Sequence, residues 1–200
     1  MRTRRARRGR EGGGSAITIV AFLRGVNVGG HRTFRPSLLA RELEAFGVVN
    51  VGATGTFVVN RPGKRGAFDA ELRRRLPFTT EIVLCDAQEL IQIASLNPFE
   101  ARAPKPDLIP FVRIFSSTPR SAVTIPYSLP SEEEWFVRAI GLRGKFAFGL
   151  YRRHMRTIRY LDQLDRAFGG AGTTRRWSTI EAVLRLLKAA RTSPAGGRNR

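Results

Sequence analysis

Short apolar, β-branched stretches alternate with amphipathic ones through the first half of the chain. The pattern predicts strands at residues 16–24, 48–51, 56–60 and 80–85. Two helices are predicted between them, one from Pro36 to a stop at Gly47 and one at residues 67–76. The order strand, helix, strand, strand, helix, strand is that of a ferredoxin-like, or split βαβ, unit.

The second half repeats these ingredients in a less regular order. Asp86 and Glu89 predict the capped start of a helix that ends near Ser95. Further elements are expected as strands at residues 109–116, 134–140 and 145–151, and as helices at 160–168 and 178–191. The last two strands are expected to form a hairpin.

These elements predict an α+β fold. A ferredoxin-like first half (residues 16–85) leaves one face of its sheet uncovered, so we expect a second, smaller α/β half (residues 86–190) of the same domain to pack there or to form a matching subdomain. Residues 1–15 and 191–200 are expected to be disordered tails.

Charge is the most unusual property of the composition. The chain has 35 Lys and Arg residues against 16 Asp and Glu, a formal net charge of +19, which points towards anionic partners. Much of this charge lies in the tails, and all but four of the basic residues are Arg, which a GC-rich coding sequence also produces. The charge alone therefore does not select a partner.

Several classes of protein are excluded. The longest largely apolar stretch, residues 16–23, is too short for a membrane span of about 20 residues. The first 15 residues have no apolar stretch and do not resemble a secretory signal. One cysteine and two histidines cannot form a disulfide scaffold or a familiar zinc site. We therefore expect a cytoplasmic protein with no metal or cofactor; the oligomeric state is open.

Three segments of the chain resemble the bacterial domain of unknown function 1697 family. They are Leu23-Arg24-Gly25-Val26-Asn27-Val28-Gly29-Gly30, Asn97-Pro98-Phe99 and Thr173-Thr174-Arg175-Arg176-Trp177-Ser178-Thr179. The resemblance implies an α+β protein with ferredoxin-like subdomains and no established activity. The chain departs from the family in having Ala53-Thr54-Gly55-Thr56 and Arg176-Trp177-Ser178 where many members have Gln-Ser-Gly-Asn and Asn-Trp-Asn.

The loop at residues 25–31 lies between the first strand and the first helix, where free backbone amides often bind phosphate. Its glycines fit neither the dinucleotide-binding nor the Walker pattern. A tight turn that Asn27 bonds to itself is the structural alternative.

The segment at residues 173–177 precedes the last helix, which is expected to start at Ser178 with Glu181 as its capping partner. An anion is favoured at such a helix end by about 0.3–1 kcal/mol. The alternative is a structural cap, with Trp177 as a core anchor.

The best hypothesis is that the two segments meet around one anionic small ligand, phosphorylated or nucleotide-like. The expected ligand-binding residues are Arg24, Gly25, Asn27, Gly29, Gly30, His31, Thr173, Thr174, Arg175 and Trp177. Two alternatives stay open. One is nonspecific nucleic-acid binding by the basic tail and by Arg152, Arg153, Arg156 and Arg159. The other is a purely structural or dimerisation module.

No catalytic group stands out. Asp162 and Asp165 are three residues apart on a predicted helix, and we expect them to pair with Arg159 and Arg166. Cys85 has no histidine beside it to activate its thiol. Whether the protein is an enzyme is therefore left open.

Overall fold

The computed structural model describes residues 17–27, 33–100, 106–120 and 123–192. The predicted tail at residues 1–15 lies outside these ranges, as do residues 193–200 of the predicted C-terminal tail. Gly29, Gly30 and His31 of the predicted ligand-binding loop lie outside them too.

The first half of the chain forms a four-stranded antiparallel sheet in the order β2-β3-β1-β4. Its strands are β1 (Ile19–Leu23), β2 (Val48–Asn50), β3 (Thr56–Val59) and β4 (Ile82–Asp86). The helices α1 (Pro36–Glu42) and α2 (Arg65–Arg75) connect them in the predicted order β-α-β-β-α-β. Pro36 occupies the first turn of α1. After a short 3₁₀ turn, Gly47 ends the segment at a φ of 62°, where a residue without Cβ is favoured.

The second half forms a five-stranded antiparallel sheet in the order β6-β7-β8-β5-β9. Its strands are β5 (Leu108–Phe115), β6 (Tyr127–Pro130), β7 (Trp135–Arg143), β8 (Phe146–Arg152) and β9 (Gly172–Arg176). Its helices are α3 (Ala87–Ser95), α4 (Thr157–Phe168) and α5 (Trp177–Thr192). The α+β class and the β7–β8 hairpin are confirmed. The expectation of a smaller second half is wrong, because β6 and β9 were not predicted and make this sheet the larger one.

The local capping signal explains where α3 begins but not where α5 begins. The capping box at α3 is confirmed: the backbone N–H of Asp86 donates to the carboxylate of Glu89 over 2.8 Å. Helix α5 begins at Trp177, one residue before the predicted start. Ser178 therefore lies inside the first turn, and the capping box expected at Ser178 is not at the cap position.

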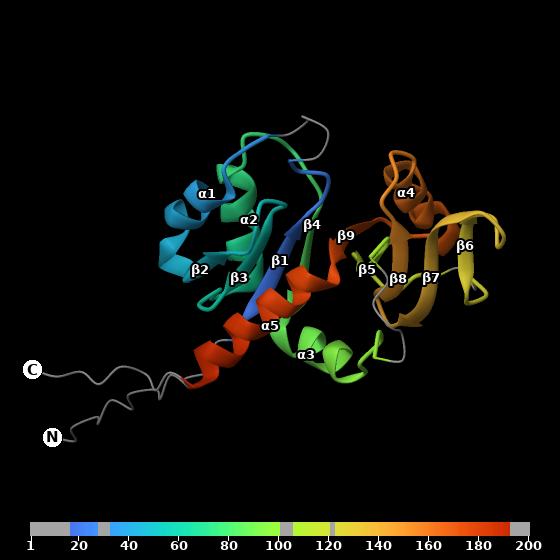
Figure 1. The fold of residues 1–200 in the computed structure, drawn as a ribbon. Helices are drawn as coiled ribbons and strands as arrows, with labels where there is room; N and C mark the ends of the chain where they lie inside the picture. Colours follow the sequence, from blue (N-terminus) through green and yellow to red (C-terminus); the bar gives the residue numbers. More distant parts are fainter. Residues whose placement is uncertain (1–16, 28–32, 101–105, 121–122, 193–200) are drawn as a thin grey trace, which may run out of the picture.

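The two sheets face a shared layer of helices (Figure 1). Helices α3 and α5 lie between the sheets, in a core that includes Phe22 of β1, Ile114 of β5 and Ile180 of α5. Helices α1 and α2 cover the other face of the first sheet, and α4 covers the other face of the second. The expectation that the second half covers the open face of the first sheet is confirmed. No helix in the described part of the chain has the length and apolar character that crossing a membrane needs.

Gly149 of β8 provides a test of the packing under α4. A Cβ at this position would lie 2.4 Å from Cζ of Phe111 and 2.6 Å from the carbonyl oxygen of Arg138. Phe111 is fully buried and is paired with Gly149 in the sheet, so neither neighbour can move freely. We expect Gly149→Ala to lower the free energy of unfolding by about 3 kcal/mol, measured by urea denaturation.

Gly141 of β7 is the matched control. A Cβ there would lie 3.6 Å from Phe148, an ordinary contact, and Gly141→Ala should change stability by no more than about 0.5 kcal/mol. Equal losses in the two variants would contradict the close approach of Phe111 to β8.

Candidate functional site

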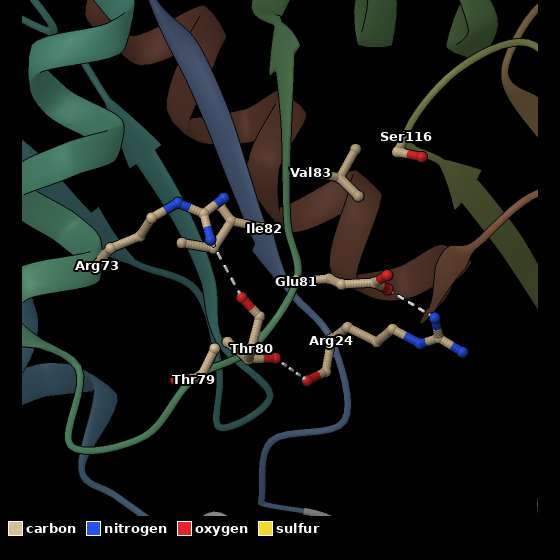
Figure 2. Close-up of a pocket in the computed structure, with 8 residues that line it drawn as sticks. All are labelled: Arg24, Arg73, Thr79, Thr80, Glu81, Ile82, Val83 and Ser116. Carbon is tan, nitrogen blue, oxygen red and sulfur yellow. Dashed lines mark hydrogen bonds and ion pairs between the residues drawn. The ribbon is translucent and has the colours of Figure 1, made fainter.

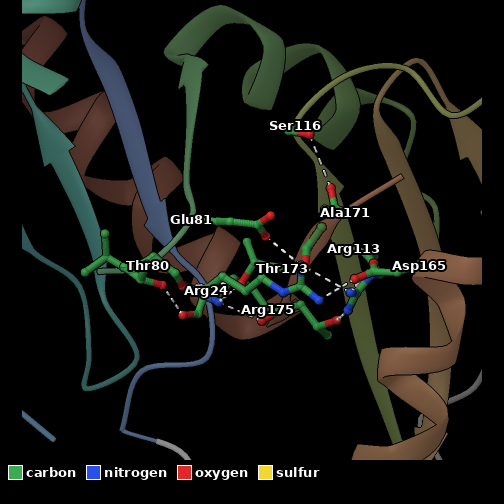
Figure 3. Close-up of polar contacts among 12 residues, drawn as sticks. Arg24, Thr80, Glu81, Arg113, Ser116, Asp165, Ala171, Thr173 and Arg175 are labelled. Atoms are coloured by element: carbon green, nitrogen blue, oxygen red, sulfur yellow. Dashed lines mark hydrogen bonds and ion pairs between the residues drawn. The ribbon is translucent and has the colours of Figure 1, made fainter. Parts of the chain in front are cut away.

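Arg175 of β9 joins the second sheet to the end of the first. Its Nη2 donates to the carbonyl oxygens of Leu23 (2.6 Å) and Thr54 (2.8 Å), and its Nε donates to the hydroxyl of Thr56 (2.7 Å). On β9 itself, Nη1 donates to the hydroxyl of Thr173 over 2.7 Å. Arg175 of the second predicted segment is therefore in direct contact with Leu23, the last residue of β1, which directly precedes the first predicted segment (Figure 3).

The Arg175 side chain carries a buried charge. The residue is only 5% exposed, and no carboxylate of the described residues forms an ion pair with it. Burial lowers its pKa to about 9, which leaves it cationic at neutral pH. All five of its N–H bonds point to protein oxygens, so Arg175 has positive charge but no free donor to offer to the cavity.

A second arginine cluster lies beside it, centred on Asp165 of α4 (Figure 3). Oδ1 of Asp165 accepts from Nε of Arg113 over 2.9 Å and also from its Nη2, while Oδ2 accepts from Nη2 of Arg24 over 2.5 Å. Arg24 also pairs with Glu81 of the loop before β4 over 2.6 Å. Burial lowers the pKa of Arg113, and the negative charge of Asp165 opposes this effect.

These contacts correct the pairing predicted for α4. Asp165 binds Arg24 and Arg113, which come from the two sheets, and not Arg159 or Arg166 of its own helix. Asp162 likewise has no ion pair with Arg159 or Arg166 in the described part of the chain. The i, i+3 and i, i+4 rule failed because buried Arg113 needs a counter-charge more than exposed arginines do.

A cavity of about 700 Å³ opens between these clusters. It is walled by the loop after β1, the β2–β3 turn, β9, the first turn of α5 and one face of α4. Of the predicted ligand-binding residues, those that line it are Arg24, Gly25, Thr173, Thr174 and Arg175. Its volume is in the range of small-molecule sites.

Asn27 holds the loop after β1 in place. Its side-chain amide donates to the carbonyl oxygens of Ala53 (2.6 Å) and Phe34 (3.2 Å), and its Oδ1 accepts from the backbone N–H of Phe34 (2.9 Å). With a φ of 54°, Asn27 is in the left-handed region that asparagine tolerates best among non-glycine residues. Both partners lie outside residues 25–31, so Asn27 has the structural role that the alternative expected but bonds to the start of the α1 region and to the β2–β3 turn, not to the loop itself.

Trp177 points away from the cavity. It packs edge-on against Phe99 and Phe148, with ring centroids 5.2 and 6.3 Å away, in the core between the sheets. This is the placement of a core anchor.

Sequence reasoning missed several of the residues that line the cavity. They are Thr54, Arg113, Tyr151, Asp162, Ser178 and Thr179. Arg113 could have been identified from the sequence, because a charged residue in the middle of an apolar strand needs a buried partner. Arg176, which belongs to the third family motif, is exposed and donates through Nε to the hydroxyl of Tyr151 over 3.1 Å.

Arg24 separates this cavity from a second hollow of about 680 Å³ along β4 (Figure 2). Here the side chain of Arg73 on α2 donates to the carbonyl oxygen of Thr80 over 3.3 Å. Arg65 makes a similar bond, over 2.5 Å, to the carbonyl oxygen of Leu84. These bonds occupy acceptors on the open edge of β4, which protects it from pairing with another strand.

The arginines of the nucleic-acid alternative lie between the end of β8 and the second turn of α4. Arg152, Arg153, Arg156 and Arg159 are all exposed. Arg152 pairs with Asp107 over 3.4 Å, and its guanidinium lies 4.8 Å from the ring centroid of Trp135.

The described residues contain neither a cluster suited to a metal ion nor a reactive cysteine. No group of three His, Cys, Asp or Glu residues within them could hold a metal ion. Cys85 is buried, and burial raises the pKa of its thiol to about 12, so it is not a thiolate at neutral pH.

Comparisons with known proteins give a family and a fold. A family model described as "Protein of unknown function (DUF1697)" matches residues 17–134. Among solved structures, the chain is similar to the conserved bacterial protein SP0830 from Streptococcus pneumoniae, with a TM-score of 0.50 and 15% identity over 86% of this chain and 98% of that one. At this identity the likeness shows the fold alone. No curated protein matches the chain.

Proposed function

The chain belongs to the DUF1697 family of proteins of unknown function, as its motifs predict, and we propose that it binds a small anionic, phosphorylated ligand in the cavity between β1, β9 and α4. The observation that carries the proposal is the charge of the lining. Arg24, Arg113, Arg175 and Arg176 line this cavity, against Asp162 alone among the acidic residues of the described ranges.

The four arginines would contribute to ligand binding in two different ways. Protein oxygens of the described residues take two of the five N–H bonds of Arg24 and one of those of Arg176, so both can donate to a phosphate. Arg113 and Arg175 are held by the protein and supply positive charge behind the cavity wall. Ser178 and Thr179 add hydroxyls at the positive end of α5.

A titration of the full chain with inorganic phosphate and pyrophosphate tests the proposal. We expect both to bind, measured by isothermal titration calorimetry at low salt. Arg176→Ala should weaken pyrophosphate binding at least about tenfold, because it removes charge-assisted hydrogen bonds without touching a buried contact.

Arg143→Ala is the matched control. Arg143 is equally exposed but lies at the β7–β8 turn, the opposite end of β8 from Tyr151, and its removal lowers the net charge by the same amount. Equal losses in the two variants, or no binding by the wild type, would contradict the proposal. Oligonucleotide binding that survives Arg176→Ala and is lost when Arg153, Arg156 and Arg159 are replaced by Ala would support the nucleic-acid alternative instead.

A further inference from the structure

Asp162 is an acidic side chain in a cavity that is otherwise suited to an anion. It lies on α4 and lines the cavity together with Arg24, Arg113 and Arg176. Its carboxylate is exposed and has no hydrogen-bond donor or ion-pair partner among the described residues. Asp165, one turn further along α4, already supplies the counter-charge that Arg24 and Arg113 need. Asp162 therefore acts on these arginines only at longer range and keeps its carboxylate oxygens free for other donors.

The wall of the cavity formed by α4 carries apolar side chains beside Asp162, whereas the wall formed by β9 and α5 is polar. Ile158 and Leu161 line the cavity beside it, and Ile158 is 56% exposed. Across the cavity, β9 and the first turn of α5 offer arginines and hydroxyls. A ligand that fills the space between the walls needs an anionic end and an uncharged body with hydrogen-bond donors and some apolar surface.

The charge around Asp162 decides which donors fit. An ionised carboxylate accepts hydrogen bonds and cannot donate them. The positive charges of Arg24 and Arg113 act in the same region, because both interact electrostatically with Asp162. These arginines would repel a ligand ammonium group, whereas neutral hydroxyl groups can donate to Asp162 without that cost.

We infer that the ligand is a phosphate monoester of a polyhydroxylated compound, a sugar phosphate or a nucleoside monophosphate, whose hydroxyl groups donate to Asp162. This inference rests on the proposed function, in which Arg24, beside α4, and Arg176, on the opposite wall, hold the phosphate. Asp162 then determines specificity: its charge weakens the binding of a bare anion without preventing it, and a ligand that carries hydrogen-bond donors compensates for this loss.

The experiment compares ligands that differ in hydroxyl groups alone. One pair is adenosine 5′-monophosphate and its 2′,3′-dideoxy analogue, and the other is ribose 5-phosphate and 2-deoxyribose 5-phosphate. We expect the full chain to bind the hydroxylated member of at least one pair about tenfold more tightly, since a hydrogen bond to a charged group has about this effect. Which pair shows the preference identifies the nucleotide or the sugar phosphate.

Asp162→Asn should abolish the preference by weakening binding of the hydroxylated ligand while leaving the deoxygenated one as tight or tighter. Asp162→Ala should give the same result. Both variants should melt at the wild-type temperature because the side chain is exposed, and Glu133→Gln, an exposed acid in the β6–β7 turn, is the control for loss of charge. Equal affinities within both pairs, or a preference that persists in the variants, would overturn the inference while phosphate binding stands. If the wild-type protein bound neither phosphate nor any of these phosphorylated ligands, the proposed function itself would be overturned.

Discussion

Replacing Arg175 with methionine is expected to lower the free energy of unfolding by about 4 kcal/mol or more, measured by urea denaturation. The guanidinium bonds two hydroxyls, of Thr56 and Thr173, and four backbone carbonyl oxygens, of Leu23, Thr54, Gly55 and Thr174. Methionine fills a similar volume but satisfies none of these acceptors. Each buried acceptor left without a donor costs about 1–3 kcal/mol.

An opposing effect reduces this loss. Burial disfavours the charge of Arg175, as its lowered pKa indicates, and the methionine variant no longer bears that cost. Replacement of buried charges by apolar residues can be neutral, but only when every polar partner is replaced as well. Here the partners are mostly backbone carbonyls, which no substitution removes. Two of them have a second donor: Gly55 accepts from the backbone N–H of Leu23, and Leu23 accepts from the hydroxyl of Thr173. The carbonyl oxygens of Thr54 and Thr174 line the cavity, so the fully buried hydroxyl of Thr56, which loses its donor, contributes most to the expected loss.

Arg176→Met is the control, because this neighbouring side chain is exposed and should contribute no more than about 0.5 kcal/mol. Arg175→Lys should also be destabilising, since three donors on one nitrogen cannot reach acceptors spread around a planar guanidinium. If Arg175→Met cost no more than Arg176→Met, water from the adjacent cavity would have to satisfy the carbonyls, and Arg175 would not be needed to join the sheets.

The sequence predicted the first sheet well because each of its elements buries a regular apolar face. All five residues of β1 are buried, and the stripe of Leu39 and Leu43 in and just after α1 packs against the same core as Phe68 of α2. Proline and glycine signals marked the ends of the first helical segment. Phe146 and Phe148 of β8 are buried in the core as packing residues.

The same reasoning could not find β9, whose sequence is Gly-Thr-Thr-Arg-Arg. A strand is normally recognised by apolar residues at every second position. In β9 the inward positions hold Thr173 and Arg175, which are buried through hydrogen bonds and not through apolar contact. The charged Arg175 therefore prevented β9 from being recognised as a strand, although its guanidinium group attaches β9 to the first sheet.

No local sequence pattern could establish that the two candidate segments lie close together in the folded protein. Arg175 and Leu23 are 152 residues apart in the chain, and their contact depends on how the second sheet docks over α5. The arginines themselves were visible in the sequence. Only the fold shows which arginines have all their N–H donors bonded to protein oxygens and which keep free donors.

Replacing Asp165 with asparagine is expected to lower the free energy of unfolding by about 3–5 kcal/mol, because it removes the counter-charge of a buried cation. The side chain of Arg113 is 3% exposed and that of Asp165 is 15% exposed, so water screens this pair poorly. The other bonds of Arg113, to the carbonyl oxygen of Gly172 and the hydroxyl of Thr174, remain but carry no charge. An asparagine oxygen can accept one of the lost bonds and cannot replace the charge.

The pair between Asp69 and Arg73 on α2 gives the matched control. It has a similar bond length, 2.9 Å, but its side chains are 30% and 46% exposed, so Asp69→Asn should cost less than about 1 kcal/mol. Arg24→Gln should fall between the two, because Arg24 is 32% exposed and shares Asp165 with Arg113. A loss in Asp165→Asn no larger than in Asp69→Asn would mean that Arg113 is stable without its carboxylate. In that case Asp162 would have to supply the missing charge, and it could no longer be kept free for a ligand.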